Sequence, residues 1–468
     1  MENMKIQHTI YLLLGFLLSS CGEDRSGEYY ALIEDKMWIE ETMQKNYLWN
    51  KDMPIIEKES EYFTEPATFF KKLLSKEALD GKGDSYSYLE EIETTNEARA
   101  ISLNRQSTYG MEFELMRDPL QGTTHNMARI LYVLPGSPAE AAGIKRGDWL
   151  TTIGKNYITT DNAKQLLNGG ANSFARDRIV TTEDGNLIWQ AVDTVSITPS
   201  IQMEISPFLI NTVYQVNGQM IAYFVYNEFA TGPQNESNET AYMEQMVQIF
   251  HQFKKEKPDA FILDLRYNPG GFLSCAQVLG SLLVPAEGLG KDFIKLQFNE
   301  QSSPQTINYT FDTQYADANL NLNKIYILTS RYTASASEAI INGLIPYMGK
   351  ENVIVIGEQT VGKNVAMSSF KDERFNFVIW PVIAYVYNSN NESDYSKGFT
   401  PQYILDERGL ISPWYPMGDE REYFLRNTIS LITTGTMPDL PTDNEDESET
   451  QVLMSSLSTR SLPGIRIK

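Results

Sequence analysis

Three short segments of the chain carry groups that together could perform nucleophilic hydrolysis. Residues 333–338 read Thr-Ala-Ser-Ala-Ser-Glu at the start of a helical pattern, and Lys363 ends a glycine-containing loop. Gly270 and Gly271 close a third segment, which follows an apolar, strand-like run. A lysine amine can take the proton of a serine hydroxyl, and backbone N–H groups at a turn or helix start can stabilise the resulting oxyanion. The pattern predicts a serine–lysine hydrolase with Ser335 as its nucleophile.

The histidine content favours lysine over histidine as the base. The chain has three histidines, His8, His125 and His251, and none lies near Ser335 in the sequence. No Gly-x-Ser-x-Gly elbow, His-Glu-x-x-His motif or Cys-x-x-Cys pattern occurs. We therefore expect a dyad of Ser335 and Lys363, and we expect no metal or organic cofactor.

Backbone groups near the two side chains are candidates for the oxyanion hole. The N–H of Ala336 is one candidate, because a helix start directs N–H groups and a positive dipole end at the site. The N–H of Gly270 or Gly271 is the other. Ser337 remains an alternative nucleophile, since local spacing does not choose between two serines two residues apart. The hydroxyl groups of Thr333, Ser335 and Ser337 could instead form a helix N-cap cluster with no catalytic role.

Lys363 must lose its proton to act as a base, which requires a pKa lowered by roughly three units. Val361, Val365 and Met367 are apolar neighbours that suit a buried pocket for the amine. The alternative is a solvated loop lysine, which is the more common environment of this residue type.

Apolar strands must hold these segments in place. The runs 260–265, 325–328 and 353–356 are nearly continuous apolar stretches, and other stretches, such as 239–253, have helical spacing. Strands of this kind are typical of parallel sheets that are buried on both faces. The sequence predicts an α/β catalytic core over residues 201–436.

The region 107–200 has a different texture, with an alternating strand at 109–115 followed by a turn, a short helix and a strand over 135–154. Its Ser-Pro-Ala-Glu-Ala-Ala-Gly-Ile-Lys-Arg-Gly-Asp run resembles the PDZ domain of C-terminal processing proteases. A PDZ domain binds an extended peptide as an added strand and captures the terminal carboxylate in a loop. The resemblance implies that this region binds substrate C-termini, and a PDZ domain that only packs against the core is the alternative. The residues expected to bind peptide are Gly110, Met111 and Phe113.

The three catalytic segments resemble, in the same order, the core of the family S41 serine peptidases, the C-terminal processing proteases. Ser-Ala-Ser-Glu matches Ser335 to the nucleophile, and Gly-Glu-Gln-Thr-Val-Gly-Lys matches Lys363 to the base. Asp-Leu-Arg-Tyr-Asn-Pro-Gly-Gly matches the segment that supplies an oxyanion glycine. The resemblance implies a multidomain α/β protein with a small N-terminal helical region, a β-rich PDZ domain and a ClpP/crotonase-like core.

Three positions depart from the family pattern. Met367 stands where many members have a glutamine that orients the lysine, Pro346 where some have an acidic residue, and Asn364 where glycine is frequent. The dyad survives these changes, but its third member is unassigned. A catalytically weakened S41-like peptide- or ligand-binding envelope protein is therefore an alternative to an active peptidase.

Residues 1–20 are expected to be a lipoprotein signal peptide. The apolar run 10–20 is too short to span a membrane, and Leu-Ser-Ser-Cys resembles a bacterial lipobox that ends at Cys21. We expect Cys21 to be lipidated, which places the protein in the cell envelope, on the periplasmic face or the outer-membrane surface. An ordinary secretory signal is the alternative. The other cysteine, Cys275, is expected to be a buried small apolar side chain.

The remaining composition sets the limits of the chain's organisation. The formal net charge of −22 argues against nucleic acid as a partner. Residues 21–106 predict a small helical region, and the acidic composition of 437–468 predicts a disordered tail. Together with the resemblance, this predicts a lipid-anchored serine endopeptidase that binds proteins or peptides with free C-termini and cleaves near those termini.

Overall fold

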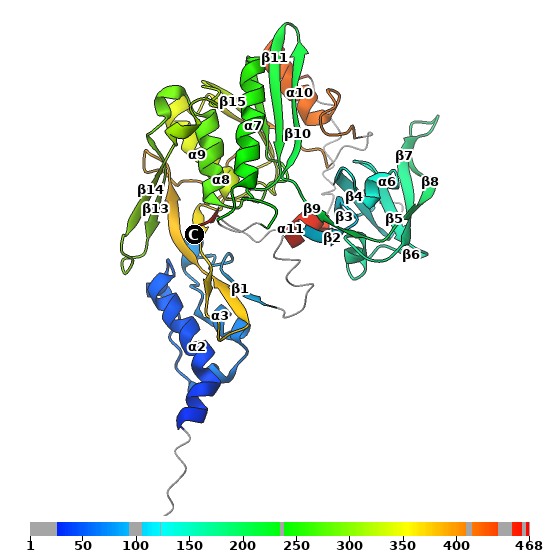
Figure 1. The fold of residues 1–468 in the computed structure, drawn as a ribbon. Coiled ribbons are helices and arrows are strands. Elements are labelled where there is room, and N and C mark those ends of the chain that lie inside the picture. The colour runs from blue at the N-terminus through cyan, green and yellow to red at the C-terminus, as the bar shows by residue number, and fades with distance from the viewer. Residues whose placement is uncertain are drawn as a thin grey trace, which may run out of the picture.

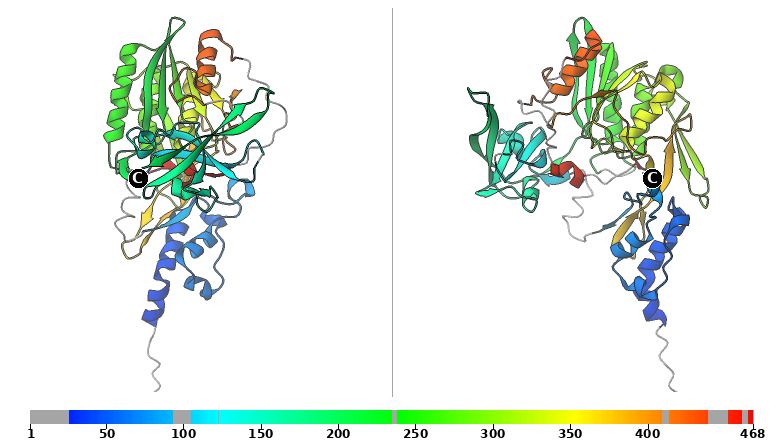
Figure 2. Two further views of the ribbon diagram at one scale, coloured as in Figure 1. Left: turned by 90° about the vertical axis from the view of Figure 1, so that its right-hand side faces the viewer. Right: turned by 180° about the vertical axis from the view of Figure 1, so that it is seen from behind.

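The computed structural model describes residues 26–92, 105–121, 123–234, 238–408, 414–438, 452–460 and 465–467. An N-terminal helical region lies at one end of the molecule, a β-rich domain stands at the side, and an α/β core joins them (Figure 1). Two further views show the short C-terminal helix in red between the β-rich domain and the core (Figure 2). The predicted signal peptide and Cys21 lie outside the described residues.

A six-stranded sheet forms the centre of the core, in the order β10-β11-β12-β15-β16-β21. β10 and β11 are antiparallel, and every later neighbouring pair is parallel. The three apolar runs of the sequence are its central strands, which are buried on both faces as predicted. The strands are β10 (Phe208–Val216), β11 (Gln219–Tyr226), β12 (Ala260–Asp264), β15 (Ile325–Thr329), β16 (Val353–Gly357) and β21 (Tyr403–Ile404).

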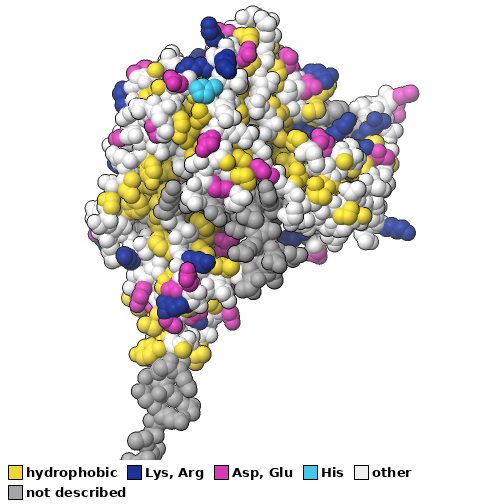
Figure 3. All heavy atoms as spheres, viewed as in Figure 1, with side chains coloured by type: hydrophobic (Ala, Val, Ile, Leu, Met, Phe, Trp, Pro, Cys, Tyr) yellow, Lys and Arg dark blue, Asp and Glu magenta, His cyan; other side chains and the backbone are white. Residues whose placement is uncertain are grey.

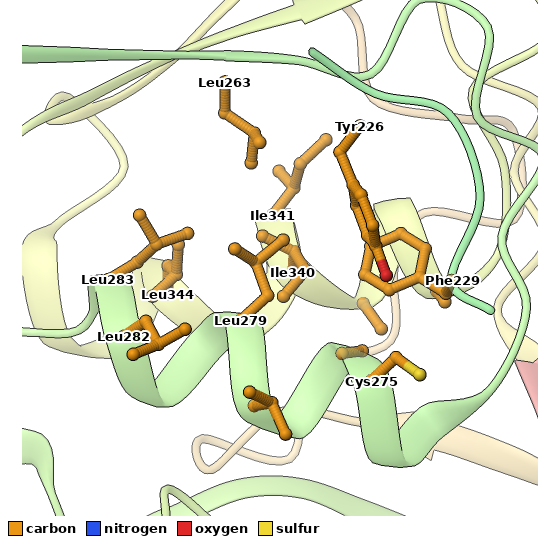
Figure 4. Close-up of a cluster of buried hydrophobic side chains, with 14 of the residues drawn as sticks. Tyr226, Phe229, Leu263, Cys275, Leu279, Leu282, Leu283, Ile340, Ile341 and Leu344 are labelled. Atoms are coloured by element: carbon orange, nitrogen blue, oxygen red, sulfur yellow. The ribbon is translucent and has the colours of Figure 1, made fainter. Parts of the chain in front are cut away.

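Helices cover both faces of this sheet. The helices on one face are α7 (Ala241–Glu256), α8 (Leu273–Leu283) and α9 (Ala336–Met348), and α10 (Tyr423–Thr434) covers the other. Figure 4 shows side chains of α8 and α9 meeting Tyr226 and Leu263 of the sheet in an apolar cluster. Cys275 lies in this cluster, fully buried, and its thiol donates to the Ala230 carbonyl at 3.3 Å. The prediction of a buried small side chain at Cys275 is confirmed.

A second sheet lies beside the first, in the order β14-β13-β20-β17-β23, and a three-stranded sheet continues from it. The second sheet contains β13 (Asp292–Phe298), β14 (Thr306–Thr310), β17 (Val365–Met367), β20 (Val382–Tyr387) and β23 (Ile465–Arg466). The small sheet contains β1 (Tyr88–Glu91), β18 (Phe370–Lys371) and β19 (Phe377–Trp380), and the short turns η4 (Ala286–Gly288) and η5 (Thr313–Tyr315) follow α8 and β14. β17 begins two residues after Lys363 and so fixes the end of the predicted lysine loop.

The N-terminal region is helical, as predicted, and packs on the β18–β19 hairpin through an apolar cluster. Its long helix α2 points away from the core (Figure 1). Its elements are α2 (Ser26–Asn46), η1 (Asn50–Asp52), η2 (Glu59–Phe63), α3 (Pro66–Leu73) and α4 (Ala78–Gly81).

Acidic and basic side chains are interspersed over the face of the molecule seen in Figure 3.

The β-rich domain is built on the sheet β22-β3-β4-β5-β7-β8, with its own apolar core. Its elements are β2 (Arg105–Thr108), β3 (Met111–Arg117), β4 (Asn126–Val133), α6 (Pro138–Ala141), β5 (Trp149–Ile153), β6 (Asn156–Tyr157), η3 (Ala163–Leu166), β7 (Asn172–Thr181), β8 (Leu187–Ile197) and β9 (Ile201–Glu204). β2 and β9 pair with each other and close the domain where it joins the core.

The C-terminal segment differs from its prediction as a disordered tail. β22 (Val452–Ser455) and α11 (Ser456–Arg460) are formed, and β23 follows them. β22 adds to the edge of the β-rich sheet and β23 to the edge of the second core sheet. The prediction from composition was wrong here because a strand added to a sheet edge is held by backbone hydrogen bonds. Such bonds form with acidic and polar residues as well as with apolar ones.

Candidate active site

Ser335 is the N-cap residue of α9 and has a backbone geometry that is rare for a residue with a side chain. Its φ is 63° and its ψ is −110°, in a strained region that clusters at functional sites. The residue is fully buried, and its Oγ has no hydrogen-bond partner among the described residues. The Ser337 hydroxyl, in contrast, donates to the Asn268 carbonyl at 3.1 Å. The structure therefore separates the two serines, with a free hydroxyl at Ser335 and a structural one at Ser337.

The glycine turn lies directly against this serine. Gly270 has a φ of +106°, and a Cβ built on it would lie 2.7 Å from the Ser335 Cβ, so a larger residue does not fit. The Gly270 N–H donates to Asn268 Oδ1 at 2.9 Å. The N–H groups of Gly271 and Ala336 form no hydrogen bond with any residue in the described ranges. Of the two glycines, only Gly271 thus keeps an N–H available for a ligand.

Lys363 is buried, with 1% of its surface exposed, as its apolar neighbours predict. Its Nζ lies 3.2 Å from Met367 Sδ and 4.4 Å from the ring centre of Tyr86. Burial lowers the pKa of Lys363 well below the ordinary lysine value, although the carboxylates of Asp84 and Glu338 act in the opposite direction. A lysine in this environment favours the neutral amine, which is the form that can accept a proton.

Glu338 links the serine helix to the lysine loop. Its Oε2 accepts the backbone N–H groups of Ser335 at 2.7 Å and of Lys363 at 2.8 Å. Its Oε1 accepts the Gly362 N–H and the Thr360 hydroxyl, both at 2.6 Å. Burial raises the pKa of Glu338, while these four donors favour the carboxylate. Sequence reasoning quoted this residue without a role, although a glutamate three residues after a helix N-cap is a known capping signal.

Lys363 lines a cavity of about 290 Å³ together with Ala334, the residue before Ser335, while Ser335 itself is fully buried and not hydrogen-bonded to Lys363. The serine Oγ is unpartnered and the lysine amine is directed to Met367, so the dyad is open. Hydrogen bonds of this kind are often long before substrate binds. The cavity is lined by Tyr86, Asn227, Glu228, Tyr267, Pro269, Gly270, Gly271, Arg331, Tyr332, Ala334, Val361, Lys363, Leu457, Ser458 and Arg466.

Two residues of the N-terminal region belong to this site and were missed by sequence reasoning. Tyr86 covers the lysine amine, and the charge of Asp84 acts on Lys363. They lie far from the three motifs in the sequence and have no motif of their own, so no local signal identifies them. Met367 stands where many family members have a glutamine that orients the lysine. Its thioether contacts the Lys363 amine, so this position still adjoins the base.

The residues predicted to bind peptide lie at the start of β3. The Gly110 N–H donates to Thr108 Oγ1 at 2.9 Å, and Met111 is fully buried. The Phe113 N–H donates to Ser456 Oγ at 2.8 Å, so it faces the first residue of α11, which directly follows the added strand β22. The outer edge of β3 is thus the part of this domain that contacts an extended segment.

A buried ion network joins the β-rich domain to the segment 264–271, which ends at the glycine turn. Arg146 donates to Glu407 at 2.5 Å and to Glu422 at 3.1 Å, and Arg266 donates to Glu422 at 2.9 Å. Arg146 also donates to the Tyr267 hydroxyl at 2.8 Å. Arg266 and Tyr267 lie in the segment that ends at the glycine turn, so the network fixes the β-rich domain relative to that turn.

The described residues include neither a metal site nor a histidine at the cavity. They contain no group of three or more His, Cys, Asp and Glu side chains that could hold a metal ion. His125 stacks on Tyr157 in the β-rich domain, and His251 lies on α7.

Comparison with known proteins decides the family. A model of peptidase family S41 matches residues 220–405, a model of the peptidase S41 N-terminal domain matches 34–88, and a PDZ-domain model matches 129–173. A crystal structure of an S41-family protein from Bacteroides fragilis is 30% identical, with a TM-score of 0.75 over 85% of this chain and 97% of that one. The chain belongs to peptidase family S41. The family and the fold class predicted from the sequence are confirmed, and the chain is a serine-type peptidase by this membership.

Curated relatives of this S41 peptidase carry more specific names. A carboxyl-terminal-processing protease of Picosynechococcus is 26% identical over 317 residues, which is 66% of this chain and 67% of that protein. One from Synechocystis is 24% identical over 314 residues, which is 63% and 65% of the two chains. The match therefore spans about two thirds of the length of these relatives.

Proposed function

We propose that this S41 peptidase cleaves proteins near their C-termini with a Ser335–Lys363 dyad. One observation carries the proposal. Ser335, with a strained backbone and an unpartnered hydroxyl, and the buried Lys363, whose pKa is lowered, both donate their backbone N–H groups to the same oxygen of Glu338. The names of the curated relatives support the choice of C-terminal substrates.

The mechanism begins with a movement of the lysine side chain. The Lys363 amine leaves Met367 and accepts the Ser335 proton, while Oγ attacks the carbonyl carbon of the scissile bond. The oxyanion that forms accepts the N–H groups of Gly271 and Ala336, which have no other partner among the described residues. The Lys363 ammonium then protonates the leaving amine, and an ester on Ser335 remains. Water attacks this ester with Lys363 again as the base, which restores both residues.

We propose that the PDZ domain presents the substrate through the edge of β3. A substrate chain added at this edge, antiparallel to β3 as β22 is, would place its C-terminus at Gly110. The buried network of Arg146, Glu407 and Glu422 supports this role, because it holds the PDZ domain against the segment that carries Gly271.

We further propose a lipid anchor at Cys21 that holds the protein in the cell envelope. The lipobox-like sequence supports it, as does the position of α2 at the end of the molecule remote from the core (Figure 1). No helix in the described parts of the chain is long and apolar enough to cross a membrane. Metabolic labelling with an alkyne-tagged fatty acid should mark the wild type and not Cys21→Ala, and equal labelling of the two would refute the anchor.

Cleavage of casein tests the dyad. We expect Ser335→Ala and Lys363→Ala to lose activity by at least about 1,000-fold, because residues of such a unit fail together. Ser337→Ala is the matched control, and its rate should stay within about threefold of wild type because its hydroxyl only caps a carbonyl. Wild-type cleavage by either dyad variant would refute the mechanism. Capture of casein without any cleavage by the wild type would favour the alternative of a binding protein.

A further inference from the structure

Residues 452–455 of this chain pair with the PDZ domain in the way that a peptide ligand would. β22 pairs antiparallel with the outer edge of β3, with Val452 opposite Met116 and Ser455 opposite Glu114. This direction carries the segment toward Gly110, the end of β3 at which a PDZ domain receives a peptide terminus. The hydroxyl of the next residue, Ser456, adds to this pairing, because it accepts the Phe113 N–H at 2.8 Å and donates to Glu112 Oε2 at 2.5 Å.

The same segment then passes along the catalytic cavity. Leu457 lines the cavity together with Lys363. Further on, the Arg466 N–H donates to the Gly271 carbonyl at 3.0 Å, and the Ile467 N–H donates to the Met367 carbonyl at 3.1 Å. Gly271 is the proposed oxyanion donor, and Met367 contacts the lysine amine. The segment therefore lies where a substrate chain must lie to reach Ser335.

The side chain of Arg466 is held by aromatic rings rather than by the backbone alone. Its guanidinium carbon is 5.5 Å from the ring centre of Phe272 and 5.5 Å from that of Trp380. Tyr88 stacks on Trp380 at 5.9 Å, and the Trp380 indole N–H donates to Glu90 at 3.0 Å. The faces of such rings attract a cation within about 6 Å of the ring centre. The rings come from the core, the β18–β19 hairpin and the N-terminal region, so folding alone brings them together.

We propose that Phe272 and Trp380 form a substrate subsite for a basic side chain, which Arg466 of the same chain fills in the resting protein. The proposal rests on the peptidase function, because it concerns substrates of the same cleft. An incoming substrate must displace residues 452–460 and 465–467, and a lysine or arginine at the matching position replaces the cation–ring contacts that Arg466 gives up.

The position of the cation also serves the dyad. Burial is the main cause of the low pKa of Lys363, and the charge of Arg466 lowers it further, against Asp84 and Glu338. A basic side chain of a substrate in the subsite would act in the same way and favour the neutral amine. A neutral side chain there would leave Lys363 with a higher pKa and a smaller share of the active form.

Release of the segment can be measured without any turnover. In a Ser335→Ala background of the full chain, limited chymotrypsin digestion followed by mass spectrometry gives the rate of cleavage within 452–467. We expect Arg466→Gln and Trp380→Leu each to raise this rate about tenfold, which corresponds to about 1.4 kcal/mol. The double variant should be no faster than either single variant, because both remove one interaction. Unchanged rates in the single variants, or additive effects in the double one, would overturn the proposal.

One control variant and one replacement variant complete the digestion experiment. Arg421→Gln also removes a guanidinium from an aromatic face, that of Tyr415 at 4.3 Å, but at an exposed site, and it should leave the rate unchanged. If Trp380→Leu does not fold, Phe272→Leu takes its place in the double-variant comparison, because Phe272 provides the other ring that contacts Arg466.

The substrate side is tested by inhibition of casein cleavage by the full-length enzyme. The inhibitors are peptides with the sequence of residues 452–468, in which the position of Arg466 holds Arg, Lys or Gln. We expect the Arg and Lys peptides to have inhibition constants about tenfold lower than the Gln peptide, and we expect Trp380→Leu to abolish the difference. Equal constants for the three peptides would overturn the subsite. If the enzyme cleaves no casein, the proposed function fails, and the digestion cycle still decides whether the rings bind the cation.

Discussion

Replacement of Glu338 by glutamine tests the link between the two halves of the dyad. The carboxylate accepts three backbone N–H groups and one hydroxyl, two donors on each oxygen. A carboxamide has one oxygen, so Glu338→Gln cannot accept all four. The best orientation keeps the oxygen toward Ser335 and Lys363 and turns the NH2 toward Thr360, whose hydroxyl can rotate to accept from it. The Gly362 N–H then has no acceptor.

The cost follows from that single lost partner. A buried donor without an acceptor costs about 1–3 kcal/mol. For a domain of 150–250 residues, each kcal/mol lowers Tm by about 2–4 °C, so the shift should be about 2–12 °C. Because Gly362 precedes the base, the Lys363 amine should be misplaced, which lowers kcat by about 10- to 100-fold. KM should change little, since Glu338 does not reach the cavity that receives substrate.

Thermal unfolding and steady-state cleavage of casein measure these effects. Glu140→Gln is the matched control, because Glu140 accepts a single backbone N–H, that of Gly136 at 2.7 Å, at an exposed site. Its Tm and kcat should equal those of the wild type. A Glu338→Gln protein with wild-type Tm and kcat would refute the role of this residue, and a change in KM alone would assign it to substrate binding instead.

Three further predictions concern the lysine, the domain network and the glycine turn. Lys363→Met should stabilise the protein at pH 7, because a lysine whose folded pKa is depressed loses a proton on folding at each pH between its folded and its unfolded pKa, and this loss opposes folding. Its stabilising effect should vanish as the pH approaches about 10.4, and equal gains at pH 7 and pH 10 in thermal unfolding would contradict this. Arg146→Met leaves Glu407 and Glu422 with one buried partner fewer, so it should lower the free energy of unfolding by about 3–5 kcal/mol in urea titration, and a loss below about 1 kcal/mol would show that the network contributes little. Gly270→Ala adds a Cβ 2.7 Å from the serine Cβ at a positive φ, so casein cleavage should fall more than tenfold, and wild-type activity would show that the turn can move aside.

The elements that surround the chemistry could be predicted from sequence because they depend on local patterns. The central strands are continuous apolar runs, since parallel strands with helices on both faces have no solvent side. Ser335 and Lys363 are each embedded in a motif. The choice between Ser335 and Ser337 was not local, because it depends on the Asn268 carbonyl from another loop.

The parts that escaped prediction depend on contacts between distant segments. Tyr86 reaches Lys363 only because the N-terminal region packs on the β18–β19 hairpin. The pairing of Arg146 with Glu422 joins residues 276 positions apart. Residues 437–468 were predicted to be disordered, whereas 452–455 and 465–466 form strands on the edges of β3 and β17.

Trapping of the acyl-enzyme tests the central claim most directly. A casein-derived peptide is mixed with the enzyme, the reaction is quenched in acid within its first turnover, and the digested protein is analysed by mass spectrometry. The account predicts an added acyl mass on the peptide that contains Ser335, located at that residue by fragmentation, and no adduct in Ser335→Ala or Lys363→Ala. An acyl group on Ser337, or product formation without any adduct in a Ser335→Ala enzyme, would contradict it.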